Sequence, residues 1–96
     1  MKLRFTYFDS ETGEADTIDF DANITALHPN AGPIIAQAFS TALSKMTGDE
    51  EVDVVFESLI VCGDKAALTF REKVVHVGGR HSYDILITGL VYSNFR

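Results

Sequence analysis

The sequence predicts a single α+β domain over residues 1–96: an N-terminal β-hairpin, one α-helix and a three-stranded antiparallel meander (ββαβββ), with the helix packed on one face of the sheet. Three observations predict it. Apolar and polar residues alternate near the N-terminus, apolar residues recur at helical spacing over 33–47, and alternation returns from residue 52 with two turn signals. The hydrophobic content of 46% and charged content of 23% are ordinary for a globular domain.

The first two strands are predicted to form a hairpin around a two-residue turn at Thr12-Gly13. This turn puts apolar side chains on one face and polar side chains on the other, as a half-buried antiparallel pair requires. The resulting register pairs Tyr7 with Ile18, Phe5 with Phe20, and Arg4 with Asp21.

Residues 33–47 are the predicted helix, because Pro33 suits the first helical position and Gly48 is a natural stop. The apolar stripe of this helix consists of Ile34, Ile35, Ala38, Phe39, Ala42, Leu43 and Met46. The opposite face is small and almost uncharged, which indicates partial cover; it consists of Gln37, Ser40, Thr41 and Ser44.

The meander begins at Val52 and turns at a three-residue loop, Gly63-Asp64-Lys65, and again at Gly78-Gly79. The predicted pairs are Glu57 with Arg71, Ile60 with Leu68, Lys73 with Asp84, Val74 with Tyr83, and His76 with His81. These registers give one common apolar face, where the helix is expected: Val52, Val54, Phe56, Ile60, Leu68, Phe70, Val74, Tyr83, Ile85 and Ile87. A parallel contact between the strands that flank the helix is also permitted.

The other face of the meander is mixed, and one helix covers only one side of a sheet. Its apolar members need the N-terminal segment, a second copy of the chain or another partner to cover them. The sequence therefore predicts a homo-oligomer, with a self-association surface formed by Val55, Leu59, Val61, Leu86 and Leu90.

Glu72 falls on the apolar face in this register, between Phe56 and Ile85. A carboxylate there is desolvated, which raises its pKa and makes it a candidate acid or base. The alternative is a bulge at residues 71–73 that turns Glu72 outward.

His76 and His81 are the weak candidates for a metal site, because cross-strand neighbours have Cβ atoms about 4.5–5.5 Å apart. Two histidines supply at most half of a zinc shell, so no metal and no cofactor are predicted. The single cysteine, Cys62, ends an apolar run and is interpreted as a small buried hydrophobe.

Acidic residues concentrate at the front of the chain. Residues 1–64 hold twelve acids and three bases (−9), and residues 65–96 hold two acids and five bases (+3), which together give the net charge of −6. The predicted hairpin register sets Asp9 across from Asp16 and Glu11 across from Glu14. Like charges in that arrangement destabilise a hairpin, so water and salt around a solvated turn, a bound cation, or a partner's Lys and Arg should offset them. The predicted partner-binding residues are Asp9, Glu11, Glu14, Asp16 and Asp19.

Larger catalytic and nucleotide-binding motifs are missing, so no enzyme is predicted. Direct nucleic-acid binding is not expected, because the net charge of −6 repels phosphate and no aromatic stacking motif accompanies the bases. No apolar run approaches the roughly 20 residues of a membrane span, and the start lacks a secretory signal. A cytoplasmic location without membrane contact is expected.

The charge pattern, the apolar face of the meander and the isolated polar residues lead to three hypotheses of function. The first is a non-enzymatic interaction protein that binds or inhibits a basic protein, such as one that binds nucleic acid, through the carboxylate-rich hairpin. The second is a self-associating structural subunit of a homo-oligomer. The third is a small ligand-binding or catalytic module around Glu72, Tyr83, His76 and His81.

Overall fold

The computed structural model describes residues 1–47, 51–75 and 82–94 of the chain. The described elements follow the predicted order, with one 3-10 turn added before the helix. Their bounds are β1 Lys2–Asp9, β2 Ala15–Asp21, η1 Pro29–Ala31, α1 Gly32–Thr47, β3 Glu51–Cys62, β4 Lys65–Val75 and β5 Ser82–Tyr92.

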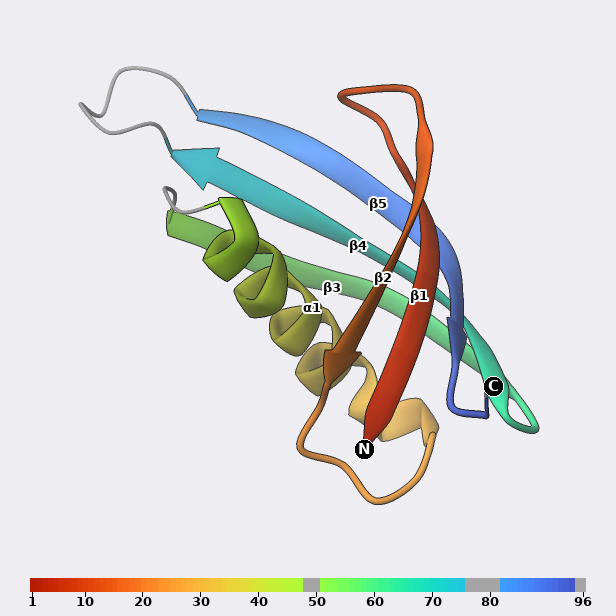
Figure 1. Ribbon diagram of the computed structural model, residues 1–96. Helices are drawn as coiled ribbons and strands as arrows, with labels where there is room; N and C mark the ends of the chain where they lie inside the picture. The colour runs from red at the N-terminus through yellow and green to blue at the C-terminus, as the bar shows by residue number, and fades with distance from the viewer. Residues whose placement is uncertain (48–50, 76–81, 95–96) are drawn as a thin grey trace.

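The strands form one antiparallel sheet in the order β2-β1-β5-β4-β3, and α1 lies against one face of it (Figure 1). The predicted α+β architecture is confirmed. The last strand of the sequence, β5, is the central strand, because it pairs with β1 on one side and β4 on the other. The strands that flank the helix in the sequence, β2 and β3, lie at opposite edges, so they make no parallel contact.

The hairpin register differs from the predicted one by two residues. Phe5 pairs with Ile18, Leu3 with Phe20, and Arg4 with Asp19. The reason is the turn, which occupies residues 10–14 rather than two residues, with Gly13 at a φ of 72°. Because the error is an even number of residues, the faces are unchanged, and Leu3, Phe5, Tyr7, Ile18 and Phe20 are all buried.

A β-bulge at Glu57 separates two registers between β3 and β4. Phe56 pairs with Phe70, but Ser58 pairs with Thr69, so Glu57 is the extra residue. The loop after β3 is also shorter than predicted, since Cys62 pairs with Lys65 and only residues 63–64 turn. After the bulge the faces exchange: Leu59 is 9% exposed, whereas Ile60 is 69% exposed.

The face prediction is therefore right on one side of the bulge and wrong on the other. Val54 and Phe56 pack against the core, and Leu68, Phe70, Ile85 and Ile87 are buried, as predicted. Ile60 was placed on the wrong face. Cys62 is exposed for the same reason, rather than buried.

The predicted register of β4 against β5 is confirmed by the pairs Val74 with Tyr83 and Lys73 with Asp84. The predicted turn at Gly78-Gly79 and the histidines at 76 and 81 lie outside the described residues.

Phe39 of α1 is at the centre of the core and is fully buried. Its ring packs edge-on against the rings of Tyr7, Phe5, Phe70 and Phe20, with centroid distances of 4.9, 5.1, 5.7 and 5.9 Å. Edge-to-face pairs add roughly 0.5–1.5 kcal/mol each beyond the burial of their area. The helix stripe is narrower than predicted, because Ile34 is 48% and Met46 is 72% exposed.

The face of the sheet opposite α1 has no layer over it among the described residues, and it mixes polar pairs with single apolar side chains. Thr6 and Thr17 share a hydrogen bond of 3.0 Å, as do Thr69 and Thr88, and Arg71 forms an ion pair of 2.6 Å with Glu57. The predicted self-association surface is wrong in two members. Leu59 is buried and Val61 packs against the core, whereas Val55 and Leu90 are exposed and Leu86 is half-buried.

Candidate functional site

The turn between β1 and β2 is held in place by local hydrogen bonds. The Asp9 carboxylate accepts from the amide of Glu11 at 2.7 Å, and the Asp9 carbonyl accepts from the amide of Gly13 at 2.9 Å. Ser10 links the turn to β5, because its amide donates to the Leu86 carbonyl at 3.1 Å and its hydroxyl accepts from the Leu86 amide at 2.9 Å. The acidic turn is thus attached to the central strand.

The predicted like-charge pairs across the hairpin do not occur. Asp16 lies opposite Tyr7, and Asp9 pairs with Ile87 of β5. Glu11 is in the turn, and the carbonyl of Glu14 accepts from the Asp9 amide at 3.4 Å. The two-residue shift of the register separates these two pairs but brings Asp9 opposite Glu14, so like charges still meet at the turn.

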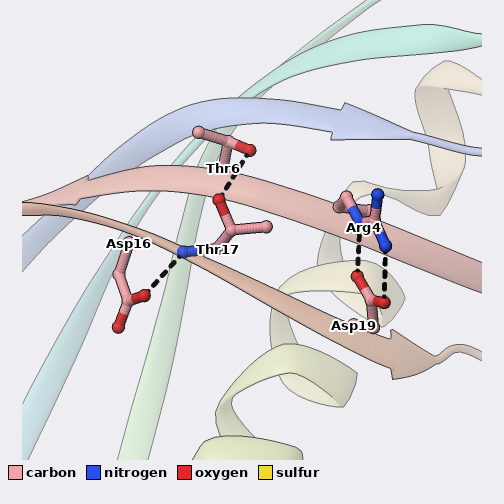
Figure 2. Close-up of polar contacts among 5 residues, drawn as sticks. All are labelled: Arg4, Thr6, Asp16, Thr17 and Asp19. Carbon is pink, nitrogen blue, oxygen red and sulfur yellow. Dashed lines mark hydrogen bonds and ion pairs between the residues drawn. The ribbon is translucent and has the colours of Figure 1, made fainter. Parts of the chain in front are cut away.

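Four of the five predicted partner-binding acids have no ion pair within residues 1–47, 51–75 and 82–94: Asp9, Glu11, Glu14 and Asp16. The fifth, Asp19, is different, because Arg4 donates to both of its oxygens at 2.7 and 3.0 Å (Figure 2). This contact lowers the pKa of Asp19 through the hydrogen bond and the charge of Arg4. Asp21, the predicted partner of Arg4, instead lies 3.8 Å from the N-terminal ammonium group.

A hollow of about 450 Å³ lies beside this turn, at the end of the sheet where α1 ends. Three of the four unpaired acids line it, and Tyr7 and Leu43 provide apolar walls. The lining residues are Tyr7, Asp9, Thr12, Glu14, Ala15, Asp16 and Leu43.

Glu72 is buried beneath the helix, at 4% exposure, and the outward bulge considered from the sequence is absent at this position. It pairs with Val54 and Ile85, and one carboxylate oxygen accepts a hydrogen bond of 2.8 Å from the Ser40 hydroxyl. Burial raises the pKa of Glu72, the Ser40 hydrogen bond opposes that rise, and the negative charge of Asp9 adds to it.

The charges of Glu72 and of the acidic turn both act on Tyr7. Its pKa is raised by burial and then by the negative charges of Asp16, Asp9 and Glu72. The phenol therefore stays protonated and is available as a hydrogen-bond donor.

The sequence did not identify Ser40 as the partner of Glu72. The sequence did show that this face of the helix is small and uncharged. The structure explains why at residue 40, because Ser40 is covered and only 1% exposed. Ser40 lies four residues after Ala36 and next to Phe39, so its position on the helix faces the core. Because buried polar groups need hydrogen-bond partners, this hydroxyl could have been matched to Glu72, the carboxylate predicted on the apolar face.

No group of three or more His, Cys, Asp and Glu residues in the described segments is arranged to hold a metal ion. His28 is the N-cap residue that precedes η1, and its Nδ1 accepts from the amide of Asn30 at 3.2 Å. His76 and His81 lie outside the described residues. No described helix has the length and apolar character needed to cross a bilayer.

Comparison with protein-family models, curated proteins and solved structures gives no significant match to this chain.

Proposed function

We propose that this protein is a small acidic interaction protein, without enzymatic activity, that binds a basic surface of another protein. The observation that carries the proposal is the acidic turn: Asp9, Glu11, Glu14 and Asp16 have no cationic partner in the described part of the chain. A basic partner supplies the missing counter-charges, and a surface that binds nucleic acid is one such surface.

The attachment of the turn supports this role. Hydrogen bonds to Leu86 fix Ser10 to the central strand, so the backbone that carries the neighbouring carboxylates is held in place without a partner. A preorganised charged surface loses less side-chain and loop entropy on binding than a mobile one does.

The test compares two triple variants with the same net charge. One neutralises the turn (Glu11→Gln, Glu14→Gln, Asp16→Asn), and the other neutralises exposed acids elsewhere (Asp53→Asn, Asp64→Asn, Asp84→Asn). Asp9 is left unchanged because its carboxylate caps the turn.

Each variant and the natural chain serve as bait for capture from the native host at low and high salt. We expect a basic partner that the control triple retains, that the turn triple loses, and that high salt releases. Equal retention by both triples would reject the acidic turn as the binding surface.

Self-association through the open face is the second candidate, and the exposed side chains of Phe8, Val55 and Leu90 favour it. The threonine pairs and ion pairs between them oppose it, because these polar groups are already satisfied and are costly to desolvate. Light scattering at high protein concentration tests it, and a monomer rejects it.

A further inference from the structure

The free edge of β2 is the least protected edge of the sheet. The opposite edge, β3, is interrupted by the bulge at Glu57, which is a common protection against strand pairing. By contrast, β2 pairs continuously with β1 over its seven residues and has no bulge and no proline.

The direction of the β2 backbone groups follows from two contacts. The Met1 ammonium group donates to the Ala22 carbonyl and the Ala22 amide to the Met1 carbonyl, and the Asp9 amide donates to the Glu14 carbonyl. Because antiparallel pairs alternate, the even-numbered residues of β2 bond to β1. The amides and carbonyls of residues 15, 17, 19 and 21 therefore face the free edge.

Within the described segments, one of these outward amides has a hydrogen-bond acceptor. The Thr17 amide donates to the carboxylate of Asp16 at 2.8 Å, so this side chain covers the middle of the edge (Figure 2). The outward amides of Asp19 and Asp21 meet no acceptor within the described segments. An incoming strand has only to displace one flexible carboxylate.

An apolar groove of about 670 Å³ runs along the same edge, between β2 and α1. Phe20 forms its β2 side, and Pro33, Ile34, Ala38 and Ala42 form its helix side. Ile34 is 48% exposed in this groove, because it lies outside the buried stripe of α1. A strand added to β2 directs every second side chain into this groove.

Charge decides between a second copy and another partner. β2 carries Asp16, Asp19 and Asp21 and no base, so two β2 strands placed edge to edge concentrate six carboxylates in one short ribbon. A basic segment is attracted instead. Lys45 closes one end of the groove, so the expected bases lie on the side of the added strand that faces away from α1.

We propose that β2 binds an extended, basic segment of a partner protein as a sixth strand, with the apolar side chains of that segment in the groove between β2 and α1. This mode rests on the proposed function and specifies the shape of the partner. Main-chain hydrogen bonds give affinity in such complexes, and the groove selects alternate side chains.

The test uses the full chain and two labelled ten-residue peptides of the same composition. In one, valine and lysine alternate; in the other, five lysines precede five valines. Only the alternating peptide can place valines on one face and lysines on the other. We expect it to bind at least about tenfold more tightly, measured by fluorescence anisotropy, because it alone fills the groove.

Amide hydrogen exchange by NMR locates the binding. The alternating peptide is expected to slow exchange at Asp19 and Asp21, which face the edge, and to leave the Ile18 amide unchanged because it already bonds to β1. Unchanged exchange at Asp19 and Asp21 in the bound state overturns the proposal.

Two variants and one control separate the edge from the groove. Thr17→Pro removes an outward amide and obstructs strand addition without removing a main-chain hydrogen bond to β1, although it removes the side-chain hydrogen bond with Thr6. Ile34→Lys places a charge in the groove, and Met46→Lys places the same charge on an exposed helical position that does not line it. The first two are expected to remove the preference for the alternating peptide, whereas Met46→Lys preserves it.

The outcomes distinguish this inference from the proposed function. If both peptides bind equally and only the Glu11→Gln/Glu14→Gln/Asp16→Asn variant weakens them, the acidic turn binds and the edge does not. If neither peptide binds, strand addition at β2 is rejected, and the capture experiment with the turn and control triples decides the proposed function by itself. If the natural chain forms a dimer that Thr17→Pro dissociates, a second copy occupies the edge and the basic segment is rejected. Should Thr17→Pro fail to fold, the exchange data and Ile34→Lys still decide.

Discussion

At the scale of single residues, Glu72 carries the strongest physical anomaly in the structure. The sequence placed it on the apolar face through strand alternation alone, and the structure confirms that placement. The sequence could not decide between burial of Glu72 and an outward bulge, because that choice depends on Ser40. The hydroxyl comes from a helix 32 positions earlier in the chain, and it provides the one hydrogen bond that makes burial tolerable.

Glu72→Gln is expected to stabilise the protein at neutral pH. A carboxyl group whose pKa is raised in the folded state binds protons more tightly there, so its contribution to stability falls as pH rises above the ordinary value of 4.5. Glutamine keeps an acceptor for Ser40 and removes the buried charge. A gain on the order of 1 kcal/mol corresponds to about 4–8 °C in a domain of this size.

Thermal unfolding at pH 5 and pH 7.5 checks this, with Glu11→Gln as a control for net charge at an exposed position. The gain from Glu72→Gln should be larger at pH 7.5 than at pH 5. A loss of stability at pH 7.5 would show that the ionised carboxylate is favourable where it lies.

Gly89 is required by the close approach of β1 and β5. It pairs with Tyr7, and a Cβ atom at this position would overlap the Thr6 carbonyl oxygen and the Tyr7 Cα. Both atoms are backbone, so neither can rotate away. Gly89→Ala is therefore expected to lower the free energy of unfolding by about 2 kcal/mol or more.

Urea unfolding measures the cost of Gly89→Ala. Thr88→Ala on the neighbouring exposed position is the control, and it removes only the hydrogen bond with Thr69. Equal midpoints for the two variants would contradict a steric requirement at Gly89.

At the scale of elements, alternation sufficed to place the buried face wherever the strand was regular, whereas the turn signal gave the right register only between β4 and β5. The pairing of Val74 with Tyr83 followed from the two glycines, and the buried side of the first hairpin survived a register error of two residues. The second half of β3 was wrong, because no local signal marks Glu57 as an extra residue. Ile60 and Leu59 are equally apolar, and only the pairing with β4 decides which of them is buried.

Deletion of Glu57 is therefore expected to be far more harmful than Glu57→Ala. The deletion removes the extra residue and forces either Val54 and Phe56 or Leu59 and Val61 off the core face. Loss of two such contacts costs roughly 3–6 kcal/mol, whereas loss of the exposed pair with Arg71 costs about 0.5 kcal/mol. Chemical denaturation compares the two variants, and similar midpoints would mean that β3 re-registers without the bulge.

At the scale of the whole molecule, acidic charge is concentrated around one turn and is only partly neutralised. The sequence identified this concentration but paired Arg4 with Asp21 instead of Asp19, because the pairing depends on a register that was wrong by two residues. In the structure Arg4 neutralises Asp19, and the four acids of the turn region remain unpaired within the described residues. Charge composition is additive along a chain, whereas ion pairs depend on which strands meet.

Salt is expected to stabilise the protein by screening this repulsion. Raising NaCl from 0.01 to 0.1 M shortens the Debye length from about 30 to about 10 Å, so the melting temperature should rise by a few degrees. The rise should be smaller in the turn triple (Glu11→Gln, Glu14→Gln, Asp16→Asn) than in the control triple (Asp53→Asn, Asp64→Asn, Asp84→Asn). The register places Asp53 and Asp84 opposite Lys73, where neutralisation relieves no repulsion. An equal rise in both triples would assign the effect to net charge.

The central position of β5 has a consequence for synthesis. Because β5 joins β1 to β4, the N-terminal hairpin and the β3–β4 pair share no strand contact until residues 82–92 have been made. A nascent chain that stops before this segment emerges from the ribosome has two two-stranded ribbons that can meet through α1 but not by strand pairing, and isolated ribbons are marginally stable at best. The domain is therefore expected to gain protection from proteolysis in one late step rather than gradually, when its last strand becomes available.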